Sequence, residues 1–230
     1  MSTMPAVRGR LTEVARASAR QIARAEARAT LTAISRPART FTGDFYLTHR
    51  HDDRLWIALG DVAGKGLPAA VVMAMIQEEL EERIVSCASA ECDPARTAAR
   101  LHEFLAPLLP RNRFATAVIA WLRDDGTLTL TNAGHCPPLI VRRDGSIEEL
   151  GSTGPILGVL PRPSWTSTTT LLEDGDTLVL YSDGVTEAVI DGEELGVEGL
   201  RAMLANGVTP EGVLEKLRAC DDVTLVVVRR

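Results

Sequence analysis

The sequence lacks any run of the roughly 20 apolar residues that a membrane-spanning helix requires. Its arginine-rich beginning also lacks the apolar core of a secretory signal. The four cysteines form no C-x-x-C pair and have no histidines at zinc-finger spacing; they are Cys87, Cys92, Cys136 and Cys220. These absences argue against a membrane protein, a secreted precursor and a structural zinc domain. We therefore expect reduced thiols in a soluble, cytoplasmic protein.

Positive charge is scarce outside the N-terminal segment. Residues 1–40 hold eight arginines against two glutamates, which leaves 17 Lys and Arg against 29 Asp and Glu in the remainder. An acidic body of this kind argues against nucleic-acid binding, which usually needs a basic face. With 230 residues, 45% of them hydrophobic, the chain is long enough for one well-packed domain.

The N-terminal segment, residues 1–36, is rich in alanine and arginine and is predicted to contain a helix over residues 8–34. Four arginines recur every fourth residue and would form one basic stripe: Arg16, Arg20, Arg24 and Arg28. Pro37 would end the helix. Such a helix either leans on the following domain or serves as a coupling or dimerisation element.

Residues 37–230 are predicted to form one α+β domain. Strands are expected at residues 41–50, 54–60, 114–122, 127–132, 138–143, 146–150, 166–171, 176–182 and 223–229. Helices are expected at residues 67–86, 94–109, 196–205 and 210–219. Consecutive strands with helices inserted in pairs indicate antiparallel sheets covered by helices, not alternating β-α-β units.

Four aspartates lie where predicted strands begin or end: Asp44, Asp61, Asp183 and the first of the pair Asp221-Asp222. Carboxylates that converge at one place repel one another unless a cation lies between them. Hard divalent ions such as Mg²⁺ and Mn²⁺ prefer oxygen ligands of this kind. The pattern predicts a metal site for hydrolysis or phosphoryl transfer, although each aspartate alone could simply end a strand.

The segment Gly60–Pro68 is the strongest local signal, because its three glycines in seven residues allow a tight turn and close approach to a ligand. An ordinary strand-to-helix turn is the alternative. The segment is not a phosphate-binding Walker loop. In that loop four residues separate the first glycine from Gly-Lys, and Ser or Thr follows, whereas here three residues separate them and Gly66 follows. Lys65 either meets a substrate phosphate or is merely solvated.

His135, Cys136 and Arg142 match the H-C-x₅-R pattern of cysteine-dependent phosphatases. That chemistry needs a loop of backbone N–H groups around a thiolate. Here two prolines follow Cys136 and remove two donors, and the next residues are predicted to form a strand. We therefore reject the cysteine mechanism, and expect His135 and Asn132 to bond to a turn or to support the site.

Six segments, taken in this order, resemble motifs of one family: Gly43–Tyr46, Gly60–Pro68, Asn132–His135, Gly154–Gly158, Ser182–Ala188 and Asp221–Thr224. The family is that of the metal-dependent serine/threonine protein phosphatases (PPM, type 2C-like), specifically the bacterial SpoIIE/RsbU branch. The resemblance covers residues 36–230. It implies an α-β-β-α sandwich, in which two stacked antiparallel β-sheets are flanked by helices, preceded here by the N-terminal helix.

The resemblance also implies a site that holds two ions, Mn²⁺ or Mg²⁺. Its implied ligands are Asp44, partly through water, Asp61, the carbonyl of Val62, Asp183 and Asp221. Asp61 would bridge both ions, and Asp61 and Asp183 would be the catalytic residues. Whether Asp221 or Asp222 is the main ligand stays open.

The implied activity is hydrolysis of phosphoserine or phosphothreonine by a water that the two ions activate, on a regulatory protein that is commonly an anti-sigma-factor antagonist. The N-terminal helix would link the domain to a regulator or to a second copy. Two departures affect the outer site: Thr42 and Leu47 replace a glycine and an acid, and the segment between Val197 and Asp221 is short. The alternatives are a catalytically degenerate interaction module and a metal-dependent nucleotide hydrolase.

Overall fold

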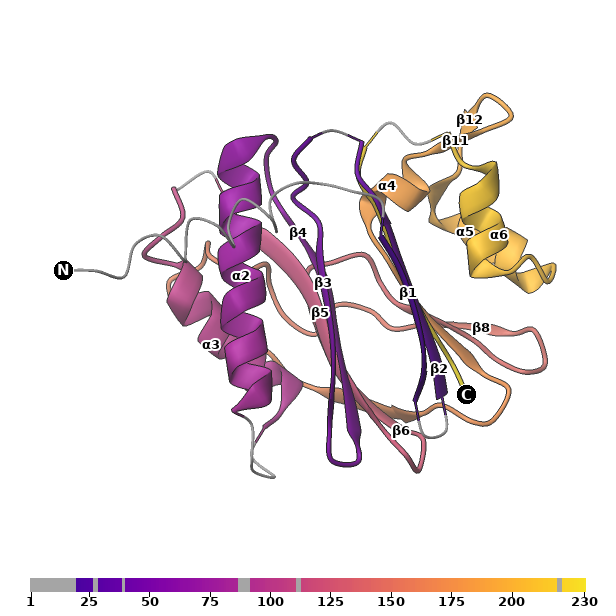
Figure 1. The fold of residues 1–230 in the computed structure, drawn as a ribbon, viewed down its shortest axis with the longest axis horizontal. Helices are drawn as coiled ribbons and strands as arrows, with labels where there is room; N and C mark the ends of the chain where they lie inside the picture. Colours follow the sequence, from indigo (N-terminus) through magenta and orange to yellow (C-terminus); the bar gives the residue numbers. More distant parts are fainter. Residues whose placement is uncertain (1–19, 27–28, 39, 87–91, 111–112, 219–220) are drawn as a thin grey trace.

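Two antiparallel sheets lie face to face in the computed structural model, which describes residues 20–26, 29–38, 40–86, 92–110, 113–218 and 221–230 (Figure 1). The order of the larger sheet is β1 (Arg20–Glu26), β2 (Ala29–Arg36), β13 (Val223–Arg229), β10 (Thr177–Tyr181), β7 (Leu139–Val141) and β8 (Ile147–Glu149). The order of the smaller sheet is β3 (Phe45–His51), β4 (Arg54–Val62), β5 (Ala115–Arg123), β6 (Thr127–Ala133) and β9 (Thr168–Leu171).

Helices cover the outer faces of both sheets (Figure 1). Helices α2 (Leu67–Val85) and α3 (Pro94–Leu105) pack on the five-stranded sheet. Beside the six-stranded sheet lie α4 (Asp183–Thr186), α5 (Gly196–Ala205), α6 (Pro210–Lys216) and the small hairpin of β11 (Val189–Ile190) and β12 (Glu193–Glu194). The predicted α-β-β-α sandwich is confirmed. The sequence prediction did not include α4 or this hairpin.

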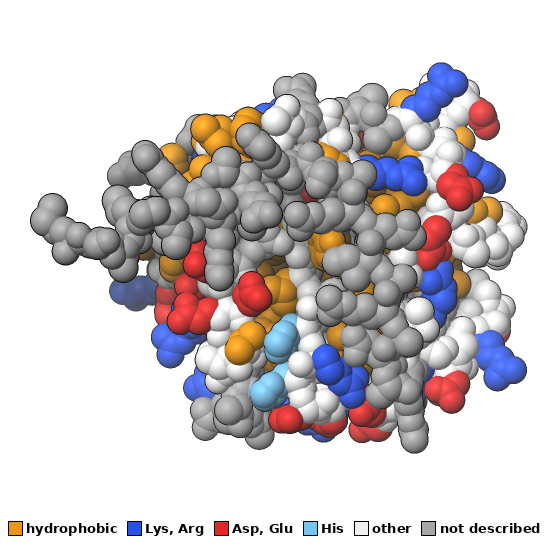
Figure 2. Space-filling model, in the orientation of Figure 1, with side chains coloured by type: hydrophobic (Ala, Val, Ile, Leu, Met, Phe, Trp, Pro, Cys, Tyr) orange, Lys and Arg blue, Asp and Glu red, His pale blue; other side chains and the backbone are white. Residues whose placement is uncertain are grey.

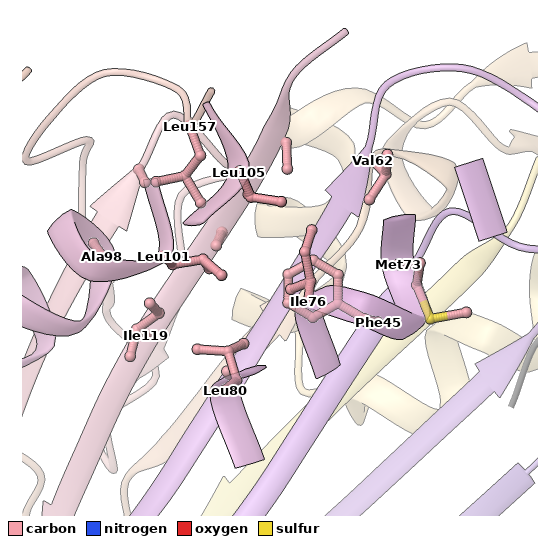
Figure 3. Close-up of a cluster of buried hydrophobic side chains, with 14 of the residues drawn as sticks. Phe45, Val62, Met73, Ile76, Leu80, Ala98, Leu101, Leu105, Ile119 and Leu157 are labelled. Carbon is pink, nitrogen blue, oxygen red and sulfur yellow. The ribbon is translucent and has the colours of Figure 1, made fainter. Parts of the chain in front are cut away.

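Side chains along each strand point alternately to the two faces of its sheet, and this alternation builds the core. In β4, Leu55, Ile57 and Leu59 point between the sheets, where they join residues of β10 and β13. The intervening Trp56 and Ala58 point outward and pack against the two helices of that side. Figure 3 shows this outer layer, with Ile76 and Leu80 of α2 and Leu101 of α3 over the sheet. Strand β4 is therefore buried on both faces over residues 55–60.

The predicted N-terminal helix is wrong wherever the structure describes this segment. Residues 20–26 and 29–36 are the strands β1 and β2, and β2 also pairs with β13. Leu31 and Ala33 face the core between the sheets, whereas Ile34 faces the outer layer, so both faces of β2 are buried. This burial and ladder pairing outweigh the helix propensity of alanine and arginine. Residues 8–19, which the helix prediction also covered, lie outside the described part of the chain.

Three further observations concern the thiols, the helices and the surface charge. Cys92 is disulfide-bonded, so the expectation of reduced thiols is wrong for this residue, whereas Cys136 is free. Among the described residues, none of the helices combines the length and apolarity needed to cross a membrane. On the described part of the face in Figure 2, acidic and basic side chains are interspersed instead of gathering into one basic area.

Candidate functional site

Asp44 and Asp61 lie opposite each other at one end of the five-stranded sheet. Asp44 directly precedes β3, Asp61 is the penultimate residue of β4, and the register pairs Phe45 with Gly60. The N–H of Val62 donates to the carbonyl of Gly43 over 3.3 Å. A Cβ atom at Gly43 would lie 2.6 Å from Asp61 Oδ1 and 2.9 Å from the Val62 carbonyl oxygen. Only glycine therefore leaves room beside these two oxygens.

Asp183 and the pair Asp221-Asp222 come from the other sheet. Asp183 follows β10 as the first residue of α4, and the pair directly precedes β13. Ser182 and Thr224 connect the two segments: the Ser182 N–H donates to the Thr224 carbonyl, and the Thr224 N–H donates to Ser182 Oγ, both over 2.9 Å. A side chain at Gly184 would clash with the Asp222 carbonyl.

Hydrogen bonds join the two sheet ends into one site. Thr224 Oγ1 donates to Asp44 Oδ2 over 2.6 Å, and both residues are buried. The Asp222 carboxylate accepts from the N–H groups of Ala38 at 2.8 Å and Gly43 at 3.3 Å. Four separate segments of the chain therefore meet here.

The two members of the aspartate pair have different surroundings. Whereas Asp222 bonds to backbone N–H groups, Asp221 Oδ2 lies 3.0 Å from Nζ of Lys65, which projects from the loop after β4. Lys65 thus reaches from the five-stranded sheet to the segment that leads into β13. The sequence suggested a phosphate contact or a solvated side chain for Lys65, and did not suggest this ion pair.

Burial and mutual repulsion make the negative charges of the site's aspartates unfavourable. Burial raises the pKa of Asp44 well above its usual value, and the charge of Asp61 raises it further. Burial, followed by the charge of Asp183, raises the pKa of Asp61 to about 7. Burial likewise raises the pKa of Asp183. A bound cation would relieve this repulsion.

The donor set fits a hard divalent ion by its chemistry, because it consists of carboxylate oxygens and the Val62 carbonyl beside a space that a Cβ at Gly43 would fill. However, no three His, Cys, Asp or Glu side chains in the described ranges are already arranged around a position for an ion. Asp44 is bonded to Thr224 and Asp221 to Lys65 instead.

Cys136 lacks the properties of a nucleophile. Burial raises the pKa of its thiol to about 12, with the charge of Asp183 as the next cause. The residues after its two prolines form β7, as predicted. A thiolate is therefore strongly disfavoured at neutral pH, which agrees with our rejection of the cysteine-phosphatase pattern.

Asn132 and His135 bond to each other across a turn, which is one of the two roles expected for them. The side-chain N–H of Asn132 donates to the His135 carbonyl over 3.1 Å, and the His135 N–H donates to Asn132 Oδ1 over 2.8 Å. His135 Nδ1 also lies 2.8 Å from Thr116 Oγ1. The sequence placed Thr224 in a family-like segment without a role for its side chain and did not single out Thr116, because a threonine in a strand carries no signal of its contacts.

Comparison with known proteins gives one family and several relatives. The family model for Stage II sporulation protein E (SpoIIE) matches residues 51–230. The phosphoserine phosphatase RsbU of Bacillus subtilis (strain 168) is 29% identical in an alignment of 212 positions, and this alignment covers 86% of this chain and 62% of that protein. The chain thus spans less than two thirds of the length of this relative.

Solved structures show the same fold. The RsbU and RsbW domains of Rv1364c from Mycobacterium tuberculosis superpose with a TM-score of 0.73 at 24% identity, covering 88% of this chain and 60% of that one. RsbX in complex with magnesium superposes with a TM-score of 0.70 at 18% identity, covering 91% and 98%. At these identities the likeness concerns the fold alone.

Proposed function

Because the chain belongs to the SpoIIE family of PP2C-type phosphatase domains, we propose that it is a metal-dependent protein serine/threonine phosphatase that works in the cytoplasm. The observation that carries this proposal is the meeting of carboxylates from four chain segments at one end of the sandwich. Burial and mutual repulsion raise the pKa values of Asp44, Asp61 and Asp183 there, and a cation bound among them would offset both effects.

We assign the metal ligands as Asp44, Asp61, the Val62 carbonyl, Asp183 and Asp221, with Asp61 and Asp183 as the catalytic residues. Asp221 is preferred to Asp222, because the Asp222 carboxylate already accepts two backbone hydrogen bonds. Two bound ions, Mn²⁺ or Mg²⁺, would supply a water of lowered pKa and neutralise charge on the phosphoryl oxygens.

Neighbouring residues of the chain hold the proposed ligands in place. Thr224 holds Asp44 from the opposite sheet, and the bonds between Ser182 and Thr224 fix the start of α4, where Asp183 lies. Gly43 keeps the space beside Asp61 open. If Asp221 held an ion, Lys65, which pairs with Asp221 in this structure, would be available to contact the substrate phosphate.

The proposed substrate is phosphoserine or phosphothreonine on a small regulatory protein, of the anti-sigma-factor-antagonist type. RsbU is named a phosphoserine phosphatase, and the Rv1364c structure contains both an RsbU and an RsbW domain. These relatives support a regulatory phosphoprotein as the substrate class.

Hydrolysis of p-nitrophenyl phosphate tests the activity, measured with Mn²⁺, with Mg²⁺ and with EDTA. We expect release of p-nitrophenol with either ion and none with EDTA. Phosphorylated antagonist proteins from the same genome would then identify the substrate by loss of phosphate. Absence of metal-dependent hydrolysis on both the ester and the phosphoproteins would refute the proposal.

A non-catalytic interaction module is the second candidate. It is favoured by the ion pair of Lys65 with Asp221, which occupies a proposed ligand. Such a module would bind the phosphorylated partner without hydrolysing it, which mixing and mass spectrometry would detect.

We also propose that residues 1–36 keep a coupling or dimerisation role. Strand β1 is the terminal strand in the order of the six-stranded sheet, and an edge strand can pair with a strand of another chain.

A further inference from the structure

His135 is buried and rigidly placed at the site end of the sandwich. Only 8% of the residue is exposed. Both backbone polar groups of His135 are bonded to the side chain of Asn132, and Gly134 makes the turn with a φ of 69°. The backbone of His135 therefore has little freedom, and its ring has a defined position.

One ring nitrogen contacts the strand beside Asp61. His135 Nδ1 lies 2.8 Å from Thr116 Oγ1, and Thr116 is the residue of β5 that pairs with Asp61 of β4. Residues paired in this way have Cα atoms about 4.5–5.5 Å apart. The ring thus contacts the direct neighbour of a proposed metal ligand in the five-stranded sheet.

The same turn lies against the other sheet. Cys136, the next residue, packs against the hydrophobic cluster that contains Tyr181, the last residue of β10, two positions before Asp183. The charges of Asp183, Asp44 and Asp61 all act on the thiol of the next residue, Cys136. The turn that carries His135 therefore lies within electrostatic range of these three carboxylates.

Packing alone does not explain a histidine here. Its Nε2 atom is buried without a hydrogen bond of normal geometry. A buried polar atom of this kind is costly, and a native structure usually retains one for a reason. A leucine would fill a similar space without that cost.

We propose that His135 is a positioning residue: its ring contacts Thr116 in one sheet, its neighbour Cys136 packs against the cluster of the other sheet, and the turn so fixes the separation of Asp61 and Asp183. The inference rests on the proposed function, because it takes those two aspartates as metal ligands. Residues that orient metal ligands typically change metal affinity or activity by about 10- to 100-fold when altered.

Thr116→Val tests the contact without altering the histidine. We expect it to weaken Mn²⁺ binding, measured by calorimetry, by about tenfold and to lower kcat on p-nitrophenyl phosphate while KM stays unchanged. Thr116→Ser keeps the hydroxyl and should stay within about twofold of wild type for both quantities. His135→Leu should weaken binding similarly, and the double variant Thr116→Val with His135→Leu should bind no more weakly than His135→Leu alone.

His102→Gln is the matched control. His102 is 6% exposed, accepts a hydrogen bond from the Gly158 N–H at 3.0 Å and packs on Trp165. This variant should lower the melting temperature but leave Mn²⁺ affinity unchanged.

Two results would overturn the inference: wild-type Mn²⁺ affinity and kcat in Thr116→Val, or additive losses in the double variant. If the wild-type protein binds Mn²⁺ but hydrolyses no phosphate ester, the proposed function fails, while the binding measurements still decide the role of His135. If the wild-type protein binds no Mn²⁺, both fail together.

Discussion

Thr224 Oγ1 donates a hydrogen bond to Asp44 Oδ2 over 2.6 Å, and this bond connects β13 of one sheet with the start of β3 in the other. Thr224 is 1% exposed and Asp44 6% exposed, so water does not compete for the bond. The hydrogen bond opposes the rise in the pKa of Asp44 that burial causes. Thr224 therefore affects both the stability of the sandwich and the charge of the site.

Thr224→Val should destabilise the protein by about 1–3 kcal/mol, because it leaves the buried Asp44 carboxyl without this donor. Urea denaturation would measure the loss, and Thr224→Ser should restore most of it. Thr129→Val is a control, since its hydroxyl bonds to another neutral hydroxyl, that of Thr169, over 3.0 Å. Equal losses in Thr224→Val and Thr129→Val would show that the charge of Asp44 is irrelevant to the bond.

Asp61→Asn and Asp183→Asn should each lower metal-dependent turnover by orders of magnitude, because each removes a proposed metal ligand. In the metal-free protein both variants should be as stable as wild type or more stable, since burial and mutual repulsion already disfavour these charges. Thermal unfolding in EDTA and rates with Mn²⁺ would check both parts.

Asp124→Asn is the control for these two variants. Asp124 lies just beyond the opposite end of β5 from the site and pairs with Arg50 at 2.6 Å. Its turnover should match that of wild type. Near-wild-type rates for Asp61→Asn or Asp183→Asn would remove these residues from the site.

The sequence predicted most elements of the fold because their patterns are local. Helix α2 begins with Leu67-Pro68, as predicted, and the observed bounds of β13 match the prediction. The prediction for the N-terminal segment was wrong because its alanines and arginines favour a helix locally, whereas pairing of β2 with β13 makes residues 29–36 a strand. The short α4 was not predicted either, since a single turn after Ser182 carries no periodicity.

The site was predictable only as far as residue type allows. Aspartates at strand ends could be identified in the sequence, and the structure brings Asp44, Asp61 and Asp183 within electrostatic range of one another. The contacts of Thr116 and Thr224 could not be predicted, because they depend on which strands are neighbours across two sheets. The different surroundings of Asp221 and Asp222 likewise depend on the backbone at Gly43.

The metal-free protein should lose stability as the pH rises from about 4 to 7. The pKa of Asp61 is about 7 in the folded state against a usual value of 3.8, so the folded state binds this proton more tightly than the unfolded chain does. The resulting stabilisation is complete below the unfolded pKa, is lost as the pH passes the folded one, and amounts to a few kcal/mol at most.

Melting temperatures between pH 5 and 8 in EDTA would measure this loss, and Asp61→Asn should reduce it. His135 acts in the opposite sense, because burial lowers its pKa to about 4 and its contribution is lost as the pH falls. Added Mn²⁺ should stabilise the protein more at pH 8 than at pH 5, since it binds the ionised carboxylates. The same dependence of melting temperature on pH in wild type and Asp61→Asn would contradict the assignment for Asp61.

Lys65→Met should strengthen Mn²⁺ binding by about two- to fivefold, because the Lys65 ammonium competes with the metal for Asp221. The pair is partly exposed, which limits the effect. Calorimetry would measure the affinity. Lys216→Met is the matched control, since Lys216 is the only other lysine in the sequence and lies in the last turn of α6. Equal affinities in wild type and Lys65→Met would show that the ion pair does not hinder metal binding.

Removal of residues 1–28 should leave a folded protein, whereas removal of residues 1–36 should prevent folding. The shorter deletion keeps β2, whose residues Leu31 and Ala33 complete the core between the sheets and whose backbone pairs with β13. The longer deletion exposes that core and leaves the ladder of β13 unpaired on one side, which costs more than the 5–15 kcal/mol that a typical domain has in reserve. Circular dichroism and thermal unfolding of both truncations would decide this. A cooperative transition after the longer deletion would mean that residues 29–36 are an appendage, as the helix prediction implied, and not a strand that the sandwich requires.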